Sequence, residues 1–187
     1  VGSEMCIRDR VSISFFEVLK NEKPLSVAGA INPYSALLAK KTGIKALYIS
    51  GAGVANASFG LPDLALTSLD NVLEDLRRIR GISNLPILVD CDTGWGSALN
   101  ISKTTKEMIS AGASGIHIED QVSEKRCGHR PNKEIVSTEE MCDRMKAARD
   151  AITDDEFMLM ARTDAFANEG INLSLIHISE PTRRHLI

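Results

Sequence analysis

Several features are missing from this 187-residue chain, and each absence argues against a class of protein. The chain has no run of basic residues and a net charge of −3, which argues against a nucleic-acid partner or an acidic membrane surface. No apolar stretch approaches the ~18 residues that a membrane span needs. None of the four cysteines forms a CxxC pair, so we expect free thiols in a reducing, cytoplasmic compartment. No GxGxxG turn is present, so nothing supports dinucleotide binding.

What is present describes an ordinary globular domain with 43% hydrophobic and 25% charged residues. The two ends differ from the rest: VGSEMCIRDR (1–10) and SLIHISEPTRRHLI (174–187) resemble translated sequencing-adapter sequence. Residues 1–10 also lack the apolar core of a signal peptide. We therefore expect one domain segment over residues 11–173, and we give no functional weight to Cys6, His177 or His185.

Hydrophobic patterning predicts strands alternating with helices. Short apolar runs predict strands over 27–31, 46–49, 86–89, 115–118 and 157–161. Helical spacing and end signals predict helices over 14–20, 34–41, 69–80, 100–111 and 138–152. Parallel neighbours need crossover helices, so this alternation indicates a parallel α/β sheet. Residues 50–66 and 121–137 lack regular patterning, and long loops of this kind are usually functional.

Each predicted strand is followed by polar residues at its carboxyl end. These residues are Asn32, Ser50, Asp90, Asp92, Glu119, Asp120, Arg162 and Asp164. The same end of every strand forms the active face of a (β/α)8 barrel, and an open doubly wound sheet would also bind ligands there. We expect an incomplete (β/α)8 barrel, of the TIM type, with about five of its eight strands in this chain.

The carboxylates at these strand ends suggest a metal site. Asp90 and Asp92 would point to opposite faces of an extended chain, but both can reach one centre where the chain turns. With Glu119 they form an all-oxygen set, which suits Mg²⁺ or Mn²⁺ rather than structural zinc. The alternative is that these acids only cap the helices that follow.

A second cluster, KRCGHR, spans residues 125–130 and places Cys127 among cations. Positive charges favour the thiolate form of a cysteine, and the same cations can hold a polycarboxylate. The alternative is a solvated basic loop that carries an incidental cysteine.

The segment KRCGHRPNKEIVS (125–137) strongly resembles the catalytic loop of the methylisocitrate lyases, in the isocitrate lyase / phosphoenolpyruvate mutase superfamily. The resemblance continues through YISGAGVANASFGLPDLALTSLDNVL, LPILVDCDTGWG, GIHIEDQ and MARTDA, and covers residues 11–172. Within the superfamily the KxCGH motif is specific to the carbon–carbon lyases.

The resemblance implies a role for individual positions. A metal set would comprise Asp90, Asp92, Asp63 and Glu119, with Mg²⁺ as the expected ion. Substrate would be bound by Ser50, Gly51, Ala52, Cys127, Gly128 and Arg162. The family often has glycine where Ala52 stands. Catalysis would involve Cys127, Arg126, His129 and Tyr48.

The implied reaction is the Mg²⁺-dependent cleavage of 2-methylisocitrate to pyruvate and succinate, with Cys127 as the general acid and Tyr48 as a candidate base. A small di- or tricarboxylate is the expected partner, and the full-length family forms homotetramers. Lyases acting on isocitrate or on a dimethylmalate-like acid remain alternatives. Cys127 argues against the phosphonate chemistry of the mutase branch. A half-barrel that folds without catalysing is a further alternative.

Overall fold

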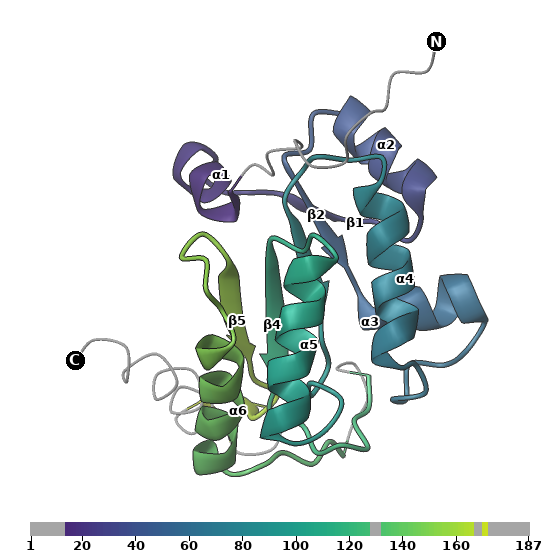
Figure 1. Cartoon of the computed structure of the whole chain (residues 1–187). Helices are drawn as coiled ribbons and strands as arrows, with labels where there is room; N and C mark the ends of the chain where they lie inside the picture. Colours follow the sequence, from purple (N-terminus) through teal and green to yellow (C-terminus); the bar gives the residue numbers. More distant parts are fainter. Residues whose placement is uncertain (1–13, 128–131, 167–169, 172–187) are drawn as a thin grey trace.

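The computed structural model describes residues 14–127, 132–166 and 170–171 (Figure 1). The strands are β1 (Val27–Gly29), β2 (Ala46–Ile49), β3 (Ile87–Asp90), β4 (Gly115–Glu119) and β5 (Met158–Arg162). The helices are α1 (Phe15–Asn21), α2 (Pro33–Lys41), α3 (Gly51–Gly53), the π-helical segment η2 (Val54–Ser58), α4 (Leu69–Arg80), α5 (Ala98–Ser110) and α6 (Thr138–Asp150).

All five strands run parallel in one sheet, in the order β1-β2-β3-β4-β5. Each strand lies beside the strand that follows it in the sequence. Every connection therefore winds in the same direction around the sheet, as in a barrel. A doubly wound sheet would reverse its order at a switch point. The prediction of an incomplete (β/α)8 barrel with five strands is therefore confirmed.

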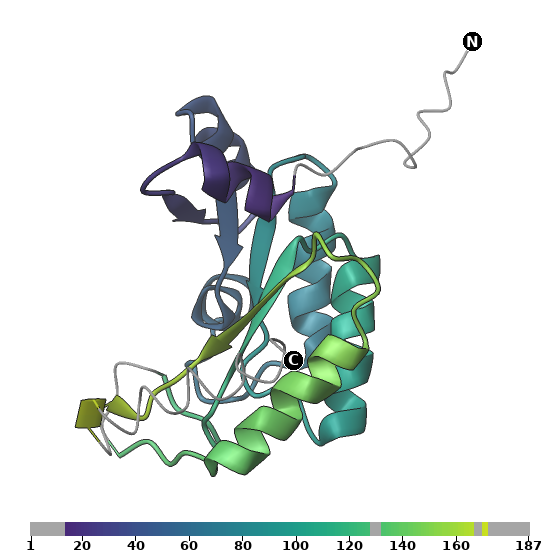
Figure 2. The same ribbon diagram turned by 90° about the vertical axis from the view of Figure 1, so that its left-hand side faces the viewer.

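Three long helices, α4, α5 and α6, cover one face of this sheet (Figures 1 and 2). The sequence offers Thr67 or Ser68 as the cap of helix α4 and Gly81 as its end. In the structure Ser68 is the cap, its side chain accepting a hydrogen bond from the backbone N–H of Asn71, and Gly81 follows the last helical residue. The alternate strand residues that face the helices are apolar and buried. They include Leu47, Ile49, Ile87, Val89, Ile116 and Ile118. The main core therefore lies outside the curved sheet, between strands and helices.

On the opposite face of the sheet, the side chains change from apolar to polar along the strands. Near the amino ends of the strands, Ala46, Leu88 and Met158 form a small apolar cluster with Phe15 from α1. Further along the same face the side chains become polar. Because side chains alternate along a strand, a residue and its second neighbour share this inner face. The inner face is thus closed by α1 at one end and chemically functional at the other.

Two details of the sequence-based prediction are wrong. Residues 50–66 are not wholly irregular, because α3 and η2 occupy residues 51–58. This segment is GAGVANAS, and its glycines and alanines give no apolar periodicity from which a helix could be predicted. Strand β1 is also shorter than expected, since it ends at Gly29. The terminal segments 1–10 and 174–187 lie outside the described residues.

No helix in the described part of the chain is both long and apolar enough to cross a membrane. Its three cysteines, Cys91, Cys127 and Cys142, are all free thiols.

Candidate active site

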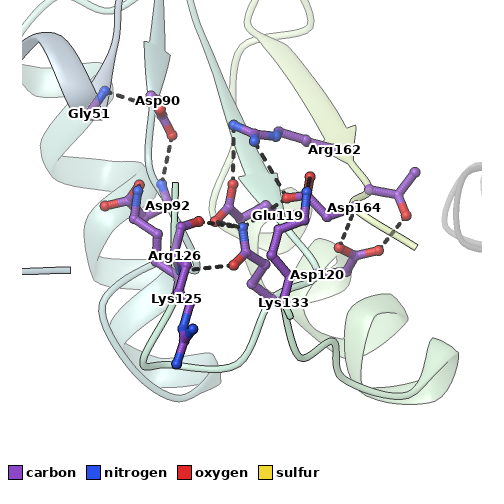
Figure 3. Close-up of polar contacts among 12 residues, drawn as sticks. Gly51, Asp90, Asp92, Glu119, Asp120, Lys125, Arg126, Lys133, Arg162 and Asp164 are labelled. Carbon is purple, nitrogen blue, oxygen red and sulfur yellow. Dashed lines mark hydrogen bonds and ion pairs between the residues drawn. The ribbon is translucent and has the colours of Figure 1, made fainter. Parts of the chain in front are cut away.

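The polar inner face of the sheet brings together side chains from β3, β4 and β5 and from the segments that follow these strands (Figure 3). Strand register fixes the arrangement: Asp90 pairs with His117, and Glu119 pairs with Arg162. Tyr48 reaches the same region from β2, since its hydroxyl lies 3.3 Å from Asp90 Oδ2. The polar residues of β3, β4 and β5 therefore lie close together, whereas Asn32, which was expected among them, is exposed and caps α2.

Asp90 and Asp92 point toward the same centre because the chain turns between them. Asp92 has a φ of 47°, in the left-handed region, and its backbone N–H donates to Asp90 Oδ1 at 3.0 Å. Gly51 lies against both carboxylates, and its N–H donates to Asp90 Oδ2 at 3.1 Å. A Cβ atom at Gly51 would stand 3.1 Å from Asp92 Oδ1 and 3.3 Å from Asp90 Oδ2.

Lys125 is the cation nearest to this acidic centre. Its ammonium group lies 2.6 Å from Asp92 Oδ1 and 2.6 Å from Asp63 Oδ1, so it links the cysteine-bearing loop to both acids. Burial alone would lower the pKa of Lys125, but the two carboxylates outweigh burial and raise it. The site thus carries a buried ammonium that remains charged.

The two aspartates are electrostatically unequal. Burial alone would raise the pKa of Asp90, but His117, the N–H of Asp92 and Lys125 hold it below its ordinary value. Burial and the charge of Asp90 raise the pKa of Asp92 to about 6, against the opposing effect of Lys125. Asp90 is therefore the more strongly ionised of the pair.

Glu119 is deeply buried and faces Arg162 across the β4–β5 pair. Its Oε2 lies 3.2 Å from Arg162 Nη1, and its Oε1 accepts a hydrogen bond from Gln121 Nε2 at 3.1 Å. Burial raises the pKa of Glu119 to about 8, although the positive charge of Arg162 opposes that shift. The ion pair leaves one third of the Arg162 side chain exposed, so its guanidinium can still meet a ligand.

Tyr48 and His117 form a second unit on the inner face. The Tyr48 hydroxyl lies 2.9 Å from His117 Nε2, and the rings stack with centroids 5.7 Å apart. Burial raises the pKa of Tyr48 and lowers that of His117. Burial therefore favours the uncharged form of both side chains, whose polar atoms lie within hydrogen-bond distance of each other.

The remaining predicted substrate-binding residues lie on the surrounding segments. Ser50 is the residue before α3, and Ala52 is inside that helix. Cys127 is partly buried. The residue before it, Arg126, is held through its backbone N–H and carbonyl by hydrogen bonds from the side chain of Gln121. The predicted residues Gly128 and His129 lie outside the described part of the chain.

The residues present suit a hard divalent cation. Asp92 Oδ1 is buried 2.6 Å from the Lys125 ammonium, so this oxygen already faces a positive charge in the structure. Every candidate donor is an oxygen atom, which is what Mg²⁺ prefers. Among the residues that the structure describes, no three His, Cys, Asp or Glu side chains are grouped closely enough to hold a metal unaided. A cation here would depend on one or two carboxylates and on water, the usual arrangement for Mg²⁺.

Sequence reasoning missed several residues that shape this site. His117 was treated only as part of an apolar strand, although its position two residues before Glu119 places both on one face. Gln121 and Asp164 were not assigned roles, yet both carry buried hydrogen bonds to the loop. Lys125 was noted only as one of several loop cations. The two-residue periodicity could have identified His117, whereas the contacts of Gln121 and Lys125 depend on the loop conformation.

Comparison with known proteins agrees with this geometry. The family model for phosphoenolpyruvate phosphomutase matches residues 15–176. A 2-methylisocitrate lyase of Shewanella oneidensis is 58% identical over 163 residues, which cover 87% of this chain and 56% of that protein. The crystal structure of 2,3-dimethylmalate lyase, a PEP mutase/isocitrate lyase superfamily member, is 32% identical with a TM-score of 0.83, covering 89% of this chain and 57% of the other.

A phosphonopyruvate hydrolase solved with oxalate and Mg²⁺ is 29% identical with a TM-score of 0.71 over 84% of this chain and 54% of the other.

The parallel sheet, with acids and a cysteine-bearing loop at its carboxyl edge, and these similarities together define a barrel enzyme of the PEP mutase/isocitrate lyase superfamily. Within that class, the chain belongs to the phosphoenolpyruvate phosphomutase family. It spans about half the length of the curated relatives that it matches.

Proposed function

We propose that the protein containing this chain is a carbon–carbon lyase that cleaves 2-methylisocitrate to pyruvate and succinate. The observation that carries the proposal is the 58% identity to the Shewanella oneidensis 2-methylisocitrate lyase, together with the segment KRCGHRPNK at residues 125–133. The buried acids and cations of the inner face support a charged, oxygen-rich substrate. We further propose a cytoplasmic homotetramer as the working form.

Asp90 and Asp92 would hold Mg²⁺, directly or through water, with Asp63 and Glu119 nearby; Mn²⁺ could replace it. When bound, the ion would supply positive charge that lowers the pKa of a hydroxyl group on a chelating substrate. The convergence of the Asp90 and Asp92 carboxylates beside Gly51 supports this assignment.

The chain's own residues would bind the substrate and move protons. Ser50, Gly51 and Ala52 would contact the pyruvate-forming end, and Arg162 would pair with a carboxylate. Tyr48 is the candidate for receiving the hydroxyl proton; because burial keeps its phenol protonated, it would do so while passing its own proton to His117 Nε2, 2.9 Å away. The partners at the succinate-forming end would be Cys127 and Gly128.

As the carbon–carbon bond breaks, its electron pair would pass to the carbon that becomes succinate. Arg126, His129 and Arg162 would stabilise the developing negative charge. Cys127 would then donate its proton to that carbon as the general acid. The atoms balance: one proton leaves the hydroxyl and one arrives at carbon.

The test uses a chimera in which residues 15–171 of this chain replace the matching segment of the Shewanella oneidensis relative. We expect Mg²⁺-dependent release of pyruvate from 2-methylisocitrate, abolished by a chelator and restored by added Mg²⁺. A folded chimera that releases no pyruvate from this substrate would contradict the proposal.

A second candidate substrate is a 2,3-dimethylmalate-type acid, favoured by the TM-score of 0.83 to the 2,3-dimethylmalate lyase. 2,3-Dimethylmalate carries a methyl group where 2-methylisocitrate carries a carboxymethyl group, on the carbon that becomes succinate. Isocitrate instead lacks the methyl group on the carbon that becomes pyruvate, and a single methyl group changes specificity by only ~10–200-fold. Comparing kcat/KM of the chimera for 2-methylisocitrate, isocitrate and 2,3-dimethylmalate would therefore decide between them.

Replacing Gly51 by alanine should weaken Mg²⁺ binding by at least roughly ten-fold. The added methyl carbon would stand 3.1 Å from Asp92 Oδ1 and 3.3 Å from Asp90 Oδ2, and would push apart the oxygens that we assign to the ion. Isothermal titration of Mg²⁺ into the chain measures the change. Gly29→Ala is the matched control, because a Cβ there meets no atom within 4 Å. Equal Mg²⁺ affinities of the two variants would show that Asp90 and Asp92 do not hold the ion.

A further inference from the structure

The loop that carries Cys127 is tied at its base. Gln121 forms an antiparallel bridge with Ile135, and the N–H of Val122 donates to the carbonyl of Glu134 at 3.0 Å. Backbone hydrogen bonds of this kind fix the two ends of the loop. They do not reach the segment around Cys127, so another contact must set where that segment lies.

Besides the ion pairs of Lys125 with Asp63 and Asp92, the side chain of Gln121, which is only 1% exposed, holds this segment. Its Oε1 accepts from the N–H of Arg126 at 2.9 Å, and its Nε2 donates to the carbonyl of Arg126 at 3.0 Å. One buried amide therefore holds both backbone polar groups of the residue that precedes Cys127. The orientation of the amide is fixed, because Nε2 faces oxygens and Oε1 faces an N–H.

Gln121 is itself held by residues of the two neighbouring strand ends. Nε2 lies 3.1 Å from Glu119 Oε1 and 2.8 Å from Asp164 Oδ2. Asp164 also binds Lys133, on the far side of the loop, at 2.9 Å, and its backbone N–H donates to Asp120. The carboxylate of Asp164 thus connects β5 to both arms of the loop (Figure 3).

We propose that Gln121 is a positioning residue: it sets the location of Cys127 by clamping the backbone of Arg126, and Asp164 holds Gln121 in place. The inference rests on the proposed function only in that Cys127 is taken as the group that meets substrate. No atom of Gln121 needs to touch the substrate.

The first test measures the reactivity of Cys127 in the 187-residue chain and in Gln121→Leu, which keeps the bulk and removes all four hydrogen bonds. Iodoacetamide labelling is followed at each cysteine by peptide mass spectrometry across pH 6–9. We expect Cys127 to react roughly ten-fold faster in the variant, with a displaced pH profile, because the released segment moves relative to its neighbouring charges. The buried thiol of Cys91 reports on folding and should remain unlabelled.

The matched control is Thr105→Val, which removes a buried hydrogen bond within α5, to the carbonyl of Ile101, and should leave Cys127 labelling unchanged. If Gln121→Leu exposes Cys91, Asp164→Asn takes its place, with a smaller change in the same direction expected. Unchanged labelling of Cys127 in a folded variant of either residue overturns the proposal.

The second test separates positioning from a purely structural role. In the chimera, Gln121→Leu should lower kcat for 2-methylisocitrate roughly ten-fold while KM changes by less than about three-fold, because the acid is displaced while the binding groups remain. A rise in KM alone would overturn the proposal. The chimera could lack lyase activity while Gln121→Leu still changes the labelling of Cys127. That result would refute the proposed function and leave the positioning role of Gln121 standing.

Discussion

Cys127→Ser in the chimera should lower kcat for 2-methylisocitrate by about 10²–10⁴-fold, the range that general acid catalysis contributes. Serine preserves the size of the side chain but is a far weaker acid than a thiol. Substrate contacts made by Ser50, Gly51 and Arg162 should persist, so binding should change little. The loss should therefore fall on turnover rather than on affinity.

Pyruvate release gives kcat, and isothermal titration of substrate into the inactive variant gives its affinity. Cys142→Ser is the matched control: it makes the same chemical exchange at a buried cysteine in α6, on the helical side of the sheet. Turnover within a few-fold of the parent in Cys127→Ser would refute the general-acid role. A comparable loss in both variants would instead point to damage of the fold.

The isolated polypeptide of residues 1–187 should release pyruvate at least about 10³-fold more slowly than the chimera. A barrel excludes water by closing on itself, whereas β1 and β5 have no further strand beside them among the described residues. The loop held by Gln121 would have no opposite wall against which to close.

The same polypeptide should self-associate. Helix α2 leaves Tyr34 68% exposed and Leu37 45% exposed, and Met160 on β5 is 42% exposed. Apolar surface of this kind at the two ends of a sheet promotes association. Size-exclusion chromatography with light scattering would detect it. A monodisperse monomer with turnover equal to that of the chimera would contradict both expectations.

Most of the scaffold could be predicted from the sequence, because its signals are local. The apolar period of 69–80, with Thr67 or Ser68 as possible caps before it and Gly81 after it, predicts the bounds of α4. Short runs such as ILVD and GIHIE are recognisable as buried parallel strands. The chain of small residues after Ser50 carried no such signal, so its helical turn and π-helical segment were missed.

The site was predictable in part for the same reason. Acids at successive strand ends must meet in a parallel sheet, and Asp90 and Asp92 do converge. The sequence could not show that the left-handed backbone of Asp92 allows this convergence. It also could not show that Lys125 enters the acidic centre, or that Gln121 holds Arg126, because both depend on how a 17-residue stretch (121–137) folds back on the sheet. The roles assigned to individual residues stay predictions.

The alternation of side chains across β4 divides the strand between two tasks. His117 and Glu119 face the chemical side, whereas Ile116 and Ile118 lie in the helical core. Each residue of β4 therefore serves either the polar site or the core. A substitution on the polar face can change the charge of the site while the apolar side chains on the other face keep their packing against the helices.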